Sequence, residues 1–598
     1  MRGRSGMLRS MPRRVPAAIA WLAFGSASAC AFACAPRSVQ NTTDAPSVRA
    51  HSEARPATTS SASPGAAAGA ERAASERPGS EQAQPNDAPR FAVVADHEEA
   101  SHAALAVLAE GGSAADAAIA AMLALAVVEP ASTGLGGGGV ALVFEASTQA
   151  TTFLDFRETA PIGVREAEVA PPVAEKLRGA RVGVPGFVAG VAELHRRFGK
   201  RPLEERFVAA AELAERGFVV SAHLARALAW HRDWILAEAD VRAAFAPSGE
   251  VLLAGERARM PTFAATLRRL APQPSALYAG ELADELVRTA GAHGSRLVRS
   301  DLAEYRALER TPLRIAWGGA DVVTAPPPSA GGLLLVETLA MHAPAELASH
   351  GYGSGAYLHV LAETFRGAIA DRVRFLGDPA FVKVDLTALV APARMQARRA
   401  RIELERTRRA DRFRLEEQGT SHVIARDSEG NVACVTTSLR DTFGARVVTE
   451  SGIVLNDALA DFSSRRVDRR FRALRHPNLP RGGARPVTGM MPTFVVRDGA
   501  VQLALGAKGG LDAPTAVTQV LLARLAFGRT PQGSVAELRV RVPPEGGLLL
   551  PAGADAALLQ DLVRRGENAR ADRFDLSAVS LLSVEGDGAT LRIETARE

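Results

Sequence analysis

Thr420 stands where a threonine can become a nucleophile. It follows Gly419 and opens "TSHVIARDSEGN" (420–431), whose alternating residues predict a strand. Inside a chain, a threonine hydroxyl has no base to take its proton. If the bond between Gly419 and Thr420 is cut, the new α-amino group, with a reference pKa of about 7.7–8.0, supplies that base. The same hydroxyl can attack the Gly419 carbonyl, which predicts self-cleavage, although such a strand start is ordinary on its own.

The strand beginning at Thr420 is predicted to form a hairpin. If the turn is "SEGN" (428–431), Thr420 stands opposite Leu439. Ser438 then faces Ser421, one position from Thr420. The register therefore places a second hydroxyl beside the candidate nucleophile.

Three other segments carry groups that acyl transfer needs. "LGAKGG" ends with Gly509 and Gly510, whose amides can approach a developing oxyanion closely. Arg157 in "FLDFRETAP" can hold a carboxylate through two hydrogen bonds. Asp461 in "GIVLNDALADFSS" is a candidate partner for an ammonium. Each has a competing interpretation. The glycines can form a simple turn, Arg157 can form a surface ion pair, and Asp461 can cap a helix or be exposed to solvent.

The elements that position these residues indicate an α+β protein. Residues 91–130 predict a strand, an amphipathic helix that stops at Gly111 and Gly112, and a nearly all-apolar helix that must be buried. The pattern from 180 to 420 is largely helical. After 420, strand-like segments return: "SHVIARD", "VACVTTSL", "GIVLND", "MPTFVVRDG" and "VQLALGAKGG". We expect sheets covered by helices on their outer faces, an αββα body.

The glycine run at 134–139, "GLGGGG", formally matches the dinucleotide-binding pattern GxGxxG. That fingerprint needs a strand before it and a helix after it, whereas here a helix comes first and a strand follows. We therefore expect close backbone packing or a tight turn.

Composition excludes several classes of protein. The chain has 598 residues, 47% of them hydrophobic, so it can bury a large core. A net charge of +5 and 5% aromatic residues do not fit a nucleic-acid groove, so no nucleic-acid partner is expected. Two of the three cysteines lie near the N-terminus, which leaves Cys434 and excludes a disulfide framework. No metal motif such as HExxH occurs.

The N-terminal residues are typical of export. In residues 1–34, Arg13 and Arg14 precede an apolar stretch that ends in small residues. Cys30 and Cys34 each follow small residues, as in a bacterial lipoprotein signal, but neither has Leu three places before it. We expect a periplasmic, envelope-anchored or secreted protein, with lipid attachment and soluble release both open. Residues 35–89 lack large apolar side chains and predict a disordered tether.

A series of ordered motifs resembles the γ-glutamyltranspeptidase (glutathione hydrolase) family of N-terminal-nucleophile (Ntn) hydrolases. They include "DHEEASHAALAVLAEGGSAADAAIAA", "LDFRETAP", "VGVPGFVAGVAELHRRFGK", "PPPSAGG", "AETFRGAIADRVRFLGDP", "TSHVIARDSEGN", "SGIVLND" and "MMPT". The likeness covers about residues 90–525 and fades beyond. It implies a four-layer αββα sandwich made by two chains from one self-cleaved precursor: a large subunit, 90–419, and a small subunit, 420–598, held together as a heterodimer.

The resemblance also implies roles for individual residues. Thr420 matches the nucleophile, Ser438 its supporting hydroxyl, and Gly509 with Gly510 the oxyanion-hole glycines. Arg157 matches the clamp for the substrate α-carboxylate, and Asp461 the partner of its α-ammonium. Cleavage falls between Gly419 and Thr420.

The departures from the family pattern lie in substrate binding. Arg440 replaces an asparagine found in many relatives, and Ala458 replaces a polar residue. A serine pair appears here as Thr488 and Gly489. Each lost hydrogen bond costs about 1–3 kcal/mol if its partner stays buried and unpaired. Arg440 would also repel an ammonium unless Asp461 neutralises it.

The leading interpretation is an exported γ-glutamyltransferase or glutathione hydrolase. It would act on γ-glutamyl compounds such as glutathione through an ester on Thr420, resolved by water, an amino acid or a peptide, without a cofactor. One alternative is a glutaryl-type amidase of the cephalosporin-acylase kind, whose substrate lacks the ammonium. Arg440 and Ala458 favour that alternative, and Asp461 opposes it. Another is an inactive relative that only binds ligands or serves structurally in the envelope.

Overall fold

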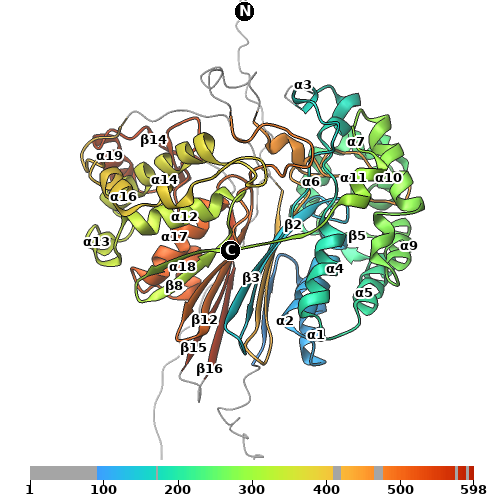
Figure 1. The fold of residues 1–598 in the computed structure, drawn as a ribbon, viewed down its shortest axis with the longest axis horizontal. Coiled ribbons are helices and arrows are strands. Elements are labelled where there is room, and N and C mark those ends of the chain that lie inside the picture. Colours follow the sequence, from blue (N-terminus) through green and yellow to red (C-terminus); the bar gives the residue numbers. More distant parts are fainter. Residues whose placement is uncertain are drawn as a thin grey trace, which may run out of the picture. The chain divides into compact units, whose positions relative to one another are not determined.

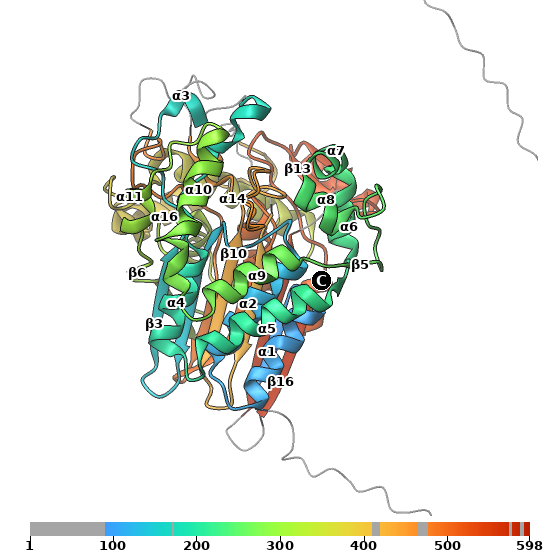
Figure 2. The same cartoon turned by 90° about the vertical axis from the view of Figure 1, so that its right-hand side faces the viewer.

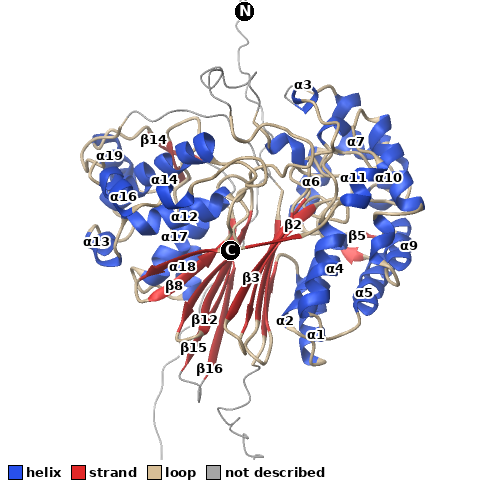
Figure 3. Cartoon of the chain, viewed as in Figure 1, coloured by secondary structure: helices blue, strands red, loops and turns tan. Residues whose placement is uncertain are grey.

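Two antiparallel sheets packed face to face form the centre of the protein (Figure 1). The structure is a computed structural model, and it describes residues 90–169, 173–408, 419–463, 476–572, 577–586 and 591–597. Figure 3 shows helices against the outer face of each sheet. The expected αββα arrangement is confirmed. The export signal, Cys30, Cys34 and the tether lie outside the described residues.

The first sheet mixes strands from before and after Gly419. Its order is β1 (Ala92–Ala95), β9 (Ser421–Arg426), β10 (Val432–Ser438), β2 (Gly138–Glu145), β3 (Ala150–Phe156) and β6 (Leu308–Arg310). Because β9 and β10 lie between β1 and β2, a cut before Thr420 leaves each piece hydrogen-bonded to the other.

The second sheet also contains strands from before and after Gly419. Its order is β16 (Leu591–Arg597), β15 (Ala578–Gly586), β12 (Ala500–Lys508), β11 (Thr493–Arg497), β8 (Ala320–Thr324) and β7 (Leu313–Trp317). The strands β7 and β8 interrupt a region whose pattern indicated helices. They form a hairpin around Gly318 and Gly319, which both have positive φ angles.

The segment "GIVLND" is not a strand of either sheet, contrary to expectation. Leu455 donates its amide hydrogen to the Val447 carbonyl, and Asn456 donates to Gly136. These bonds go to loops, so the segment makes only isolated bridges. Ile453 and Leu455 are buried although the segment joins no ladder of hydrogen-bonded strands.

Helices α1 (Glu98–Ala109), α2 (Ala114–Val128), α4 (Phe187–Phe198), α5 (Leu203–Arg216) and α9 (Pro261–Leu270) form the layer beside the first sheet. Figure 2 shows them on one side of the molecule. Every residue of α2 is buried, as its nearly all-apolar sequence predicts, and Ser113 with Asp116 forms a capping box at its start. Successive side chains of β2 point to opposite faces of the sheet. Ala141 and Val143 belong to the core shared with α2, whereas Leu142 belongs to the core between the sheets.

Helices α12 (Ala330–Met341), α14 (Gly355–Phe375) and α17 (Ala513–Leu525) form the layer beside the second sheet. Other described helices are α3 (Glu166–Val169), α6 (Ala222–Trp230), α7 (Arg232–Ala237), α8 (Ala239–Phe245), α10 (Glu281–Ala292), α11 (Arg299–Glu304), α13 (Pro344–Ser349), α15 (Leu386–Leu389), α16 (Pro392–Arg399), α18 (Pro531–Ala536) and α19 (Ala556–Arg564). The 3-10 helices are η1 (Glu175–Arg181), η2 (Pro274–Leu277) and η3 (Ala458–Asp461). Two small sheets pair β4 (Phe218–Val219) with β5 (Arg257–Ala258) and β13 (Leu548–Pro551) with β14 (Ala569–Asp572). Within the described ranges, no helix is both long and apolar enough to cross a bilayer.

The hairpin of β9 and β10 differs by one residue from the predicted register. Ser421 pairs with Thr437 rather than Ser438. Continuing this register by one residue brings Thr420 opposite Ser438. The turn is longer than expected because the Asp427 carboxylate accepts hydrogen bonds from two backbone amides within it, at 3.0 Å each. In the observed register, Thr420 and Ser438 are therefore closer together than predicted.

Candidate active site

One cavity brings together most residues that the sequence assigned to chemistry. In antiparallel sheets, the start of one strand lies beside the end of its neighbour. Thr420 precedes β9, Ser438 ends β10, and Arg157 follows β3. The cavity is lined by Thr420, Ser438, Arg440, Arg157, Asp461, Thr488, Gly489, Gly509 and Gly510, among others. Gly419, bonded to Thr420, is not part of the lining. We call this cavity the acyl pocket.

The Gly419 carbonyl lies within reach of a hydroxyl donor. The Ser438 hydroxyl donates a hydrogen bond to this oxygen, and the Arg440 amide donates to Ser438 Oγ at 2.7 Å. Gly419 itself has a φ of +68°, a left-handed conformation that glycine adopts without strain. Thr420 is only 7% exposed. The contact polarises the carbonyl carbon that the Thr420 hydroxyl would attack.

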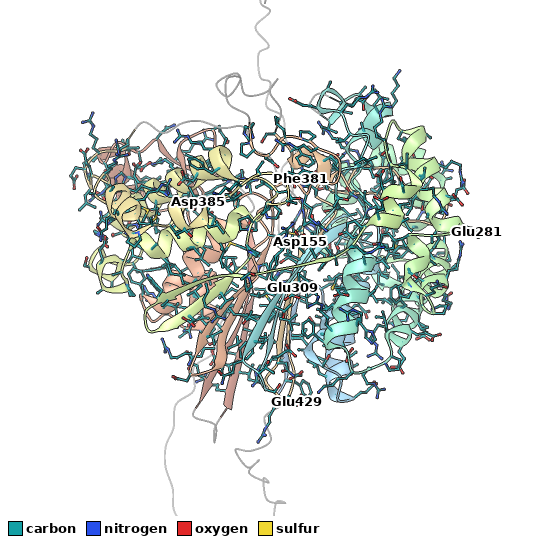
Figure 4. The ribbon with its side chains drawn as sticks, viewed as in Figure 1. Asp155, Glu281, Glu309, Phe381, Asp385 and Glu429 are labelled. Atoms are coloured by element: carbon teal, nitrogen blue, oxygen red, sulfur yellow. The ribbon has the colours of Figure 1, made fainter. Side chains whose placement is uncertain are left out.

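Arg157 is held rigidly from its backbone outward. The Asp155 carboxylate accepts a hydrogen bond from the Arg157 amide at 3.0 Å, and the Tyr305 hydroxyl donates to the Arg157 carbonyl at 2.8 Å. Figure 4 labels Asp155, which lies near the middle of the molecule. The Arg157 side chain is buried, and its Nη2 donates to Asp461 Oδ2 at 3.0 Å. The guanidinium is thus fixed inside the acyl pocket.

The carboxylate of Asp461 is engaged from both sides. Its Oδ2 accepts from Arg157, and its Oδ1 accepts from Arg440 Nε at 2.9 Å. Arg440 Nη1 also donates to Asp457 Oδ2 at 3.3 Å. Although burial alone would lower the pKa of Arg440, Asp461 and Asp457 raise it above its usual value. Two guanidiniums therefore compete with any substrate ammonium for one carboxylate.

Asp457 shares Arg440 with Asp461 but differs in its ionisation. Burial raises the pKa of Asp457 to about 7, against the lowering effects of Arg440 and Arg181. Asp457 therefore carries only part of a negative charge at neutral pH. The partners of Arg440 therefore carry less than two full negative charges at neutral pH.

The glycine run 134–139 allows β2 to lie tightly against the site. A Cβ on Gly137 would stand 2.3 Å from the Ser438 carbonyl oxygen, and a Cβ on Gly139 equally close to that of Thr436. Gly134, by contrast, has nothing within 4 Å of its Cβ position. The predicted close backbone packing is confirmed, and its effect is to fix the end of β10.

The loop after β12 also requires glycine. Gly509 has a φ of +133°, and a Cβ there would stand 2.3 Å from Ser577 Oγ. Gly509 and Gly510 line the acyl pocket. Because glycine has no side chain, these two residues present only backbone groups to it.

Two polar residues at the site are not identified by the sequence pattern. Asp457 stands four residues before Asp461, and this spacing in "NDALAD" is its only signal. Thr436 lines the acyl pocket and lies 2.8 Å from His422 Nδ1. Burial lowers the pKa of His422 to about 3, so this imidazole is neutral. A Cβ on Gly506 would strike the ring at 1.9 Å, which shows how closely the second sheet approaches it.

Among the described side chains, no group of three or more His, Cys, Asp or Glu residues is arranged to hold a metal ion. The chemistry available at the site is that of a hydroxyl nucleophile, backbone amides and paired charges.

The sequence of this chain is similar to that of a known protein family. The family model described as Gamma-glutamyltranspeptidase matches residues 100–597, well beyond the point near 525 where the motifs fade. The glutathione hydrolase proenzyme of Escherichia coli (strain K12) is 33% identical over 71% of this chain and 76% of that protein. The acylase ACY 1 proenzyme of Pseudomonas sp. (strain SE83) is 32% identical over 81% of this chain and 88% of that protein.

A solved structure shares the fold over almost its whole length. The cephalosporin acylase from Bacillus halodurans superposes with a TM-score of 0.74 and 26% identity, over 86% of this chain and 97% of that one. The extent of the family match, together with these relatives, settles the classification. The chain belongs to the γ-glutamyltranspeptidase family.

Proposed function

We propose that this protein is a γ-glutamyl hydrolase or transferase that activates itself by cutting before Thr420. The observation that carries the proposal is the hydrogen bond from Ser438 to the Gly419 carbonyl, at the bond that must break. Family membership supports the choice of acyl group, and so does the buried guanidinium of Arg157 in the lining of the acyl pocket.

Activation proceeds as an acyl shift from nitrogen to oxygen. Thr420 Oγ1 attacks the Gly419 carbonyl carbon, and Ser438 stabilises the oxyanion. The C–N bond then breaks, and the hydroxyl proton ends on the Thr420 nitrogen. Water hydrolyses the resulting ester, which leaves a carboxylate on Gly419 and a free amine and hydroxyl on Thr420.

Turnover then uses the new amine as the base. The Thr420 amine takes the hydroxyl proton, and Oγ1 attacks the γ-carbonyl of the substrate. The amides of Gly509 and Gly510 stabilise the oxyanion, and the leaving amine takes the proton. Water or an acceptor amine resolves the ester, so no cofactor takes part.

The test is denaturing electrophoresis of the purified protein, with mass spectrometry of its fragments. We expect two bands with a new terminus at Thr420, and a single band for Thr420→Ala. The cleaved protein should release nitroaniline from γ-glutamyl-4-nitroanilide. A protein that stays whole after long incubation, or that is cut elsewhere, contradicts the proposal.

A glutaryl-type amidase is the second candidate, favoured by one observation. Arg440 donates a hydrogen bond to Asp461, the carboxylate that would hold the substrate α-ammonium. An acyl group with a carboxylate but no ammonium avoids this competition. Glutaryl-4-nitroanilide tests the choice, and faster cleavage of this compound than of the γ-glutamyl anilide would select the second candidate.

We also propose that the protein is exported and either anchored by a lipid on Cys30 or Cys34 or released. The basis is the sequence of residues 1–34. Detergent phase partition of the wild type and a Cys30→Ala, Cys34→Ala double variant separates the two states. A mature protein that retains residues 1–34 in the cytoplasm contradicts export.

A further inference from the structure

A buried ion pair lies behind the loop that follows β12. Lys508 is the last residue of β12, and we call residues 508–510 the oxyanion loop. The Lys508 ammonium lies 3.7 Å from Glu129 Oε2, and the two side chains are only 13% and 2% exposed. Within the described ranges, Glu129 is the only ion-pair partner of Lys508. Neither residue lines the acyl pocket, so any effect of the pair on the reaction must pass through the loop.

Glu129 is fixed at the end of α2 through both its backbone and its side chain. Its amide donates to the Leu125 carbonyl at 2.8 Å, and its own carbonyl accepts from the Ser132 amide at 2.9 Å. Its Oε1 accepts from the Ser221 hydroxyl at 2.8 Å. Its Oε2 is buried and accepts no hydrogen bond from the residues that the structure describes. Because a buried carboxylate without a nearby cation is costly, this oxygen needs a positive charge beside it.

Lys508 supplies that positive charge. Another candidate is His223, whose Nε2 lies 3.9 Å from Glu129 Oε2. Burial and then the charge of Lys508 lower the pKa of His223. Burial also lowers the pKa of His97, on which Glu129 and Lys508 both act. Both imidazoles are therefore mainly neutral at neutral pH, and the ion pair at Oε2 is formed by Lys508.

The ion pair lies next to the peptide unit that would bind the oxyanion. The Gly509 amide belongs to the planar unit that starts at the Lys508 carbonyl, so the backbone angles of both residues set the direction of its N–H. Gly509 has a φ of +133°, and glycine is the residue with the least steric restriction of this angle. Ser577 limits the loop, because a Cβ on Gly509 would stand 2.3 Å from its Oγ. The side chain of Lys508, drawn to Glu129, is a second restraint.

The turn that begins at Glu129 also contacts the end of β10. The Ser132 carbonyl accepts a hydrogen bond from the Leu439 amide at 2.9 Å. The Thr133 hydroxyl donates to Thr437 Oγ1 at 2.9 Å. Thr437 and Leu439 are the neighbours of Ser438 in the chain. One turn therefore supports both the hydroxyl beside Thr420 and, through the ion pair, the oxyanion loop.

We propose that Glu129 and Lys508 are positioning residues for acyl transfer, and that their ion pair holds the Gly509 amide toward the substrate oxyanion. The inference rests on the proposed acyl transfer. Self-cleavage does not use the oxyanion loop in that mechanism, since Ser438 contacts the carbonyl of the bond to be cut. Loss of the ion pair should therefore slow turnover without slowing self-cleavage. A general loss of packing would slow both.

The first experiment measures both reactions in variants of the ion pair. Glu129→Gln and Lys508→Met each remove one charge and nearly keep the shape of the side chain. We expect each to lower kcat for the faster-cleaved anilide, γ-glutamyl or glutaryl, by about tenfold, a part of the roughly 100-fold loss of a whole oxyanion donor. KM and the rate of self-cleavage should stay within about twofold of the wild type, because the interaction acts on the transition state of turnover.

Two further variants test whether the charges act as a pair. Lys508→Arg keeps the cation and should restore most of kcat. The double variant Glu129→Gln, Lys508→Met should lose no more than either single variant, because both changes remove the same interaction.

The matched control is Lys200→Met. Lys200 pairs with Glu429, and the two side chains are 44% and 62% exposed. Its kcat should match the wild type. Unchanged kcat in Glu129→Gln and Lys508→Met overturns the inference and leaves the proposed function intact. Equal slowing of self-cleavage and turnover, with no recovery in Lys508→Arg, assigns the pair to folding and also overturns the inference. A wild type that cleaves neither anilide overturns the proposed function, and the inference with it.

The second experiment measures binding at the oxyanion loop without turnover. 4-Boronobutanoate has the shape of a glutaryl group, and its boron accepts a bond from Thr420 Oγ1 while the hydroxyl proton passes to the Thr420 amine. The tetrahedral adduct carries a boron-bound oxygen where the oxyanion would lie, whereas glutarate forms no such adduct. In calorimetric titrations, Glu129→Gln should weaken binding of the boronate by about tenfold and leave binding of glutarate unchanged. Equal weakening of both ligands, or of neither, overturns the inference.

Discussion

Arg440 brings a second guanidinium, beside that of Arg157, into the lining of the acyl pocket. It pairs with Asp461 and Asp457 together, where the sequence resemblance leads one to expect an asparagine. The repulsion that Arg440 would exert on an ammonium is therefore not simply cancelled by Asp461, because Arg157 also draws on that carboxylate. We therefore expect the position of this guanidinium to influence the selectivity between γ-glutamyl and glutaryl groups.

Replacing Arg440 by asparagine should shift this selectivity. Arg440→Asn removes the competitor for Asp461, so the ratio of kcat/KM for γ-glutamyl over glutaryl anilide should rise about tenfold or more. Arg440→Lys keeps the charge and should leave the ratio near that of the wild type. Steady-state kinetics with both anilides measure the change. A ratio that falls in Arg440→Asn would mean that the guanidinium binds the substrate directly.

Ser438 belongs to the same scale, because one hydroxyl contacts the bond to be cut. Ser438→Ala removes the donor to the Gly419 carbonyl, and self-cleavage should slow by about 100-fold or more, as when one oxyanion donor is lost. Ser438→Thr keeps a hydroxyl and should restore most of the rate. Conversion of the uncut band over time gives the rate. Unaltered cleavage in Ser438→Ala would assign the stabilisation to another group.

At the scale of elements, the site depends on how closely β2 approaches β10. The glycine run lets the start of β2 pass the Ser438 carbonyl, and the Asp427 turn sets the register of β9. Asp427 also accepts a hydrogen bond from the Ala114 amide at 3.0 Å, which ties the hairpin to the first turn of α2. The hydroxyls are thus aligned by a strand contact at one end and by a turn at the other.

Gly137→Ala tests this strand contact. The added Cβ would meet the Ser438 carbonyl oxygen at 2.3 Å, so β10 must shift, at a cost of about 1–3 kcal/mol. We expect lower thermal stability and slower cleavage. Gly134→Ala is the matched control from the same run, since its Cβ meets nothing within 4 Å. Equal behaviour of the two variants would remove the packing argument.

At the scale of the whole molecule, the segments before and after Thr420 are joined by buried charges as well as by sheets that contain strands of both. His359 on α14 lies 2.7 Å from Glu567, which also pairs with Arg366 at 3.0 Å through Nη1. His359 and Glu567 have fully buried side chains. Since His359 precedes Thr420 and Glu567 follows it, the pair would link the two pieces after the proposed cleavage.

Glu567→Gln should destabilise the cleaved protein in a pH-dependent way. Burial alone would lower the pKa of His359, but Glu567 and the Glu403 carbonyl raise it above its usual value. The stabilisation is therefore complete below the unfolded pKa of about 6.5 and is lost as pH rises through the folded pKa. Thermal unfolding of Glu567→Gln should show a larger loss at pH 6 than at pH 9. The loss at pH 6 should approach the roughly 3–5 kcal/mol of a broken buried pair.

The control for this prediction is Glu585→Gln. Glu585 pairs with Arg524, but its side chain is 62% exposed. Its cost should stay within about 1 kcal/mol. A loss for Glu567→Gln that is equal at both pH values would show that His359 is not the partner that matters.

Local pattern determined much of this protein. The nearly all-apolar run that forms α2 and the glycines beside β10 can be interpreted from neighbouring residues alone, because periodicity and backbone freedom are local properties. The same holds for the residues that meet in the acyl pocket, since each follows or precedes a predicted strand. The hairpin β7–β8 was hidden by its helical surroundings.

Only the tertiary structure decided the register of β9 and β10 and the charge of the acyl pocket. The register depends on hydrogen bonds that the Asp427 carboxylate accepts, one of them from the start of α2, and the charge depends on Arg440 lying between Asp457 and Asp461. Neither follows from sequence spacing, because the free energy of a turn or an ion pair is set by which distant groups fold against it and how far water is excluded.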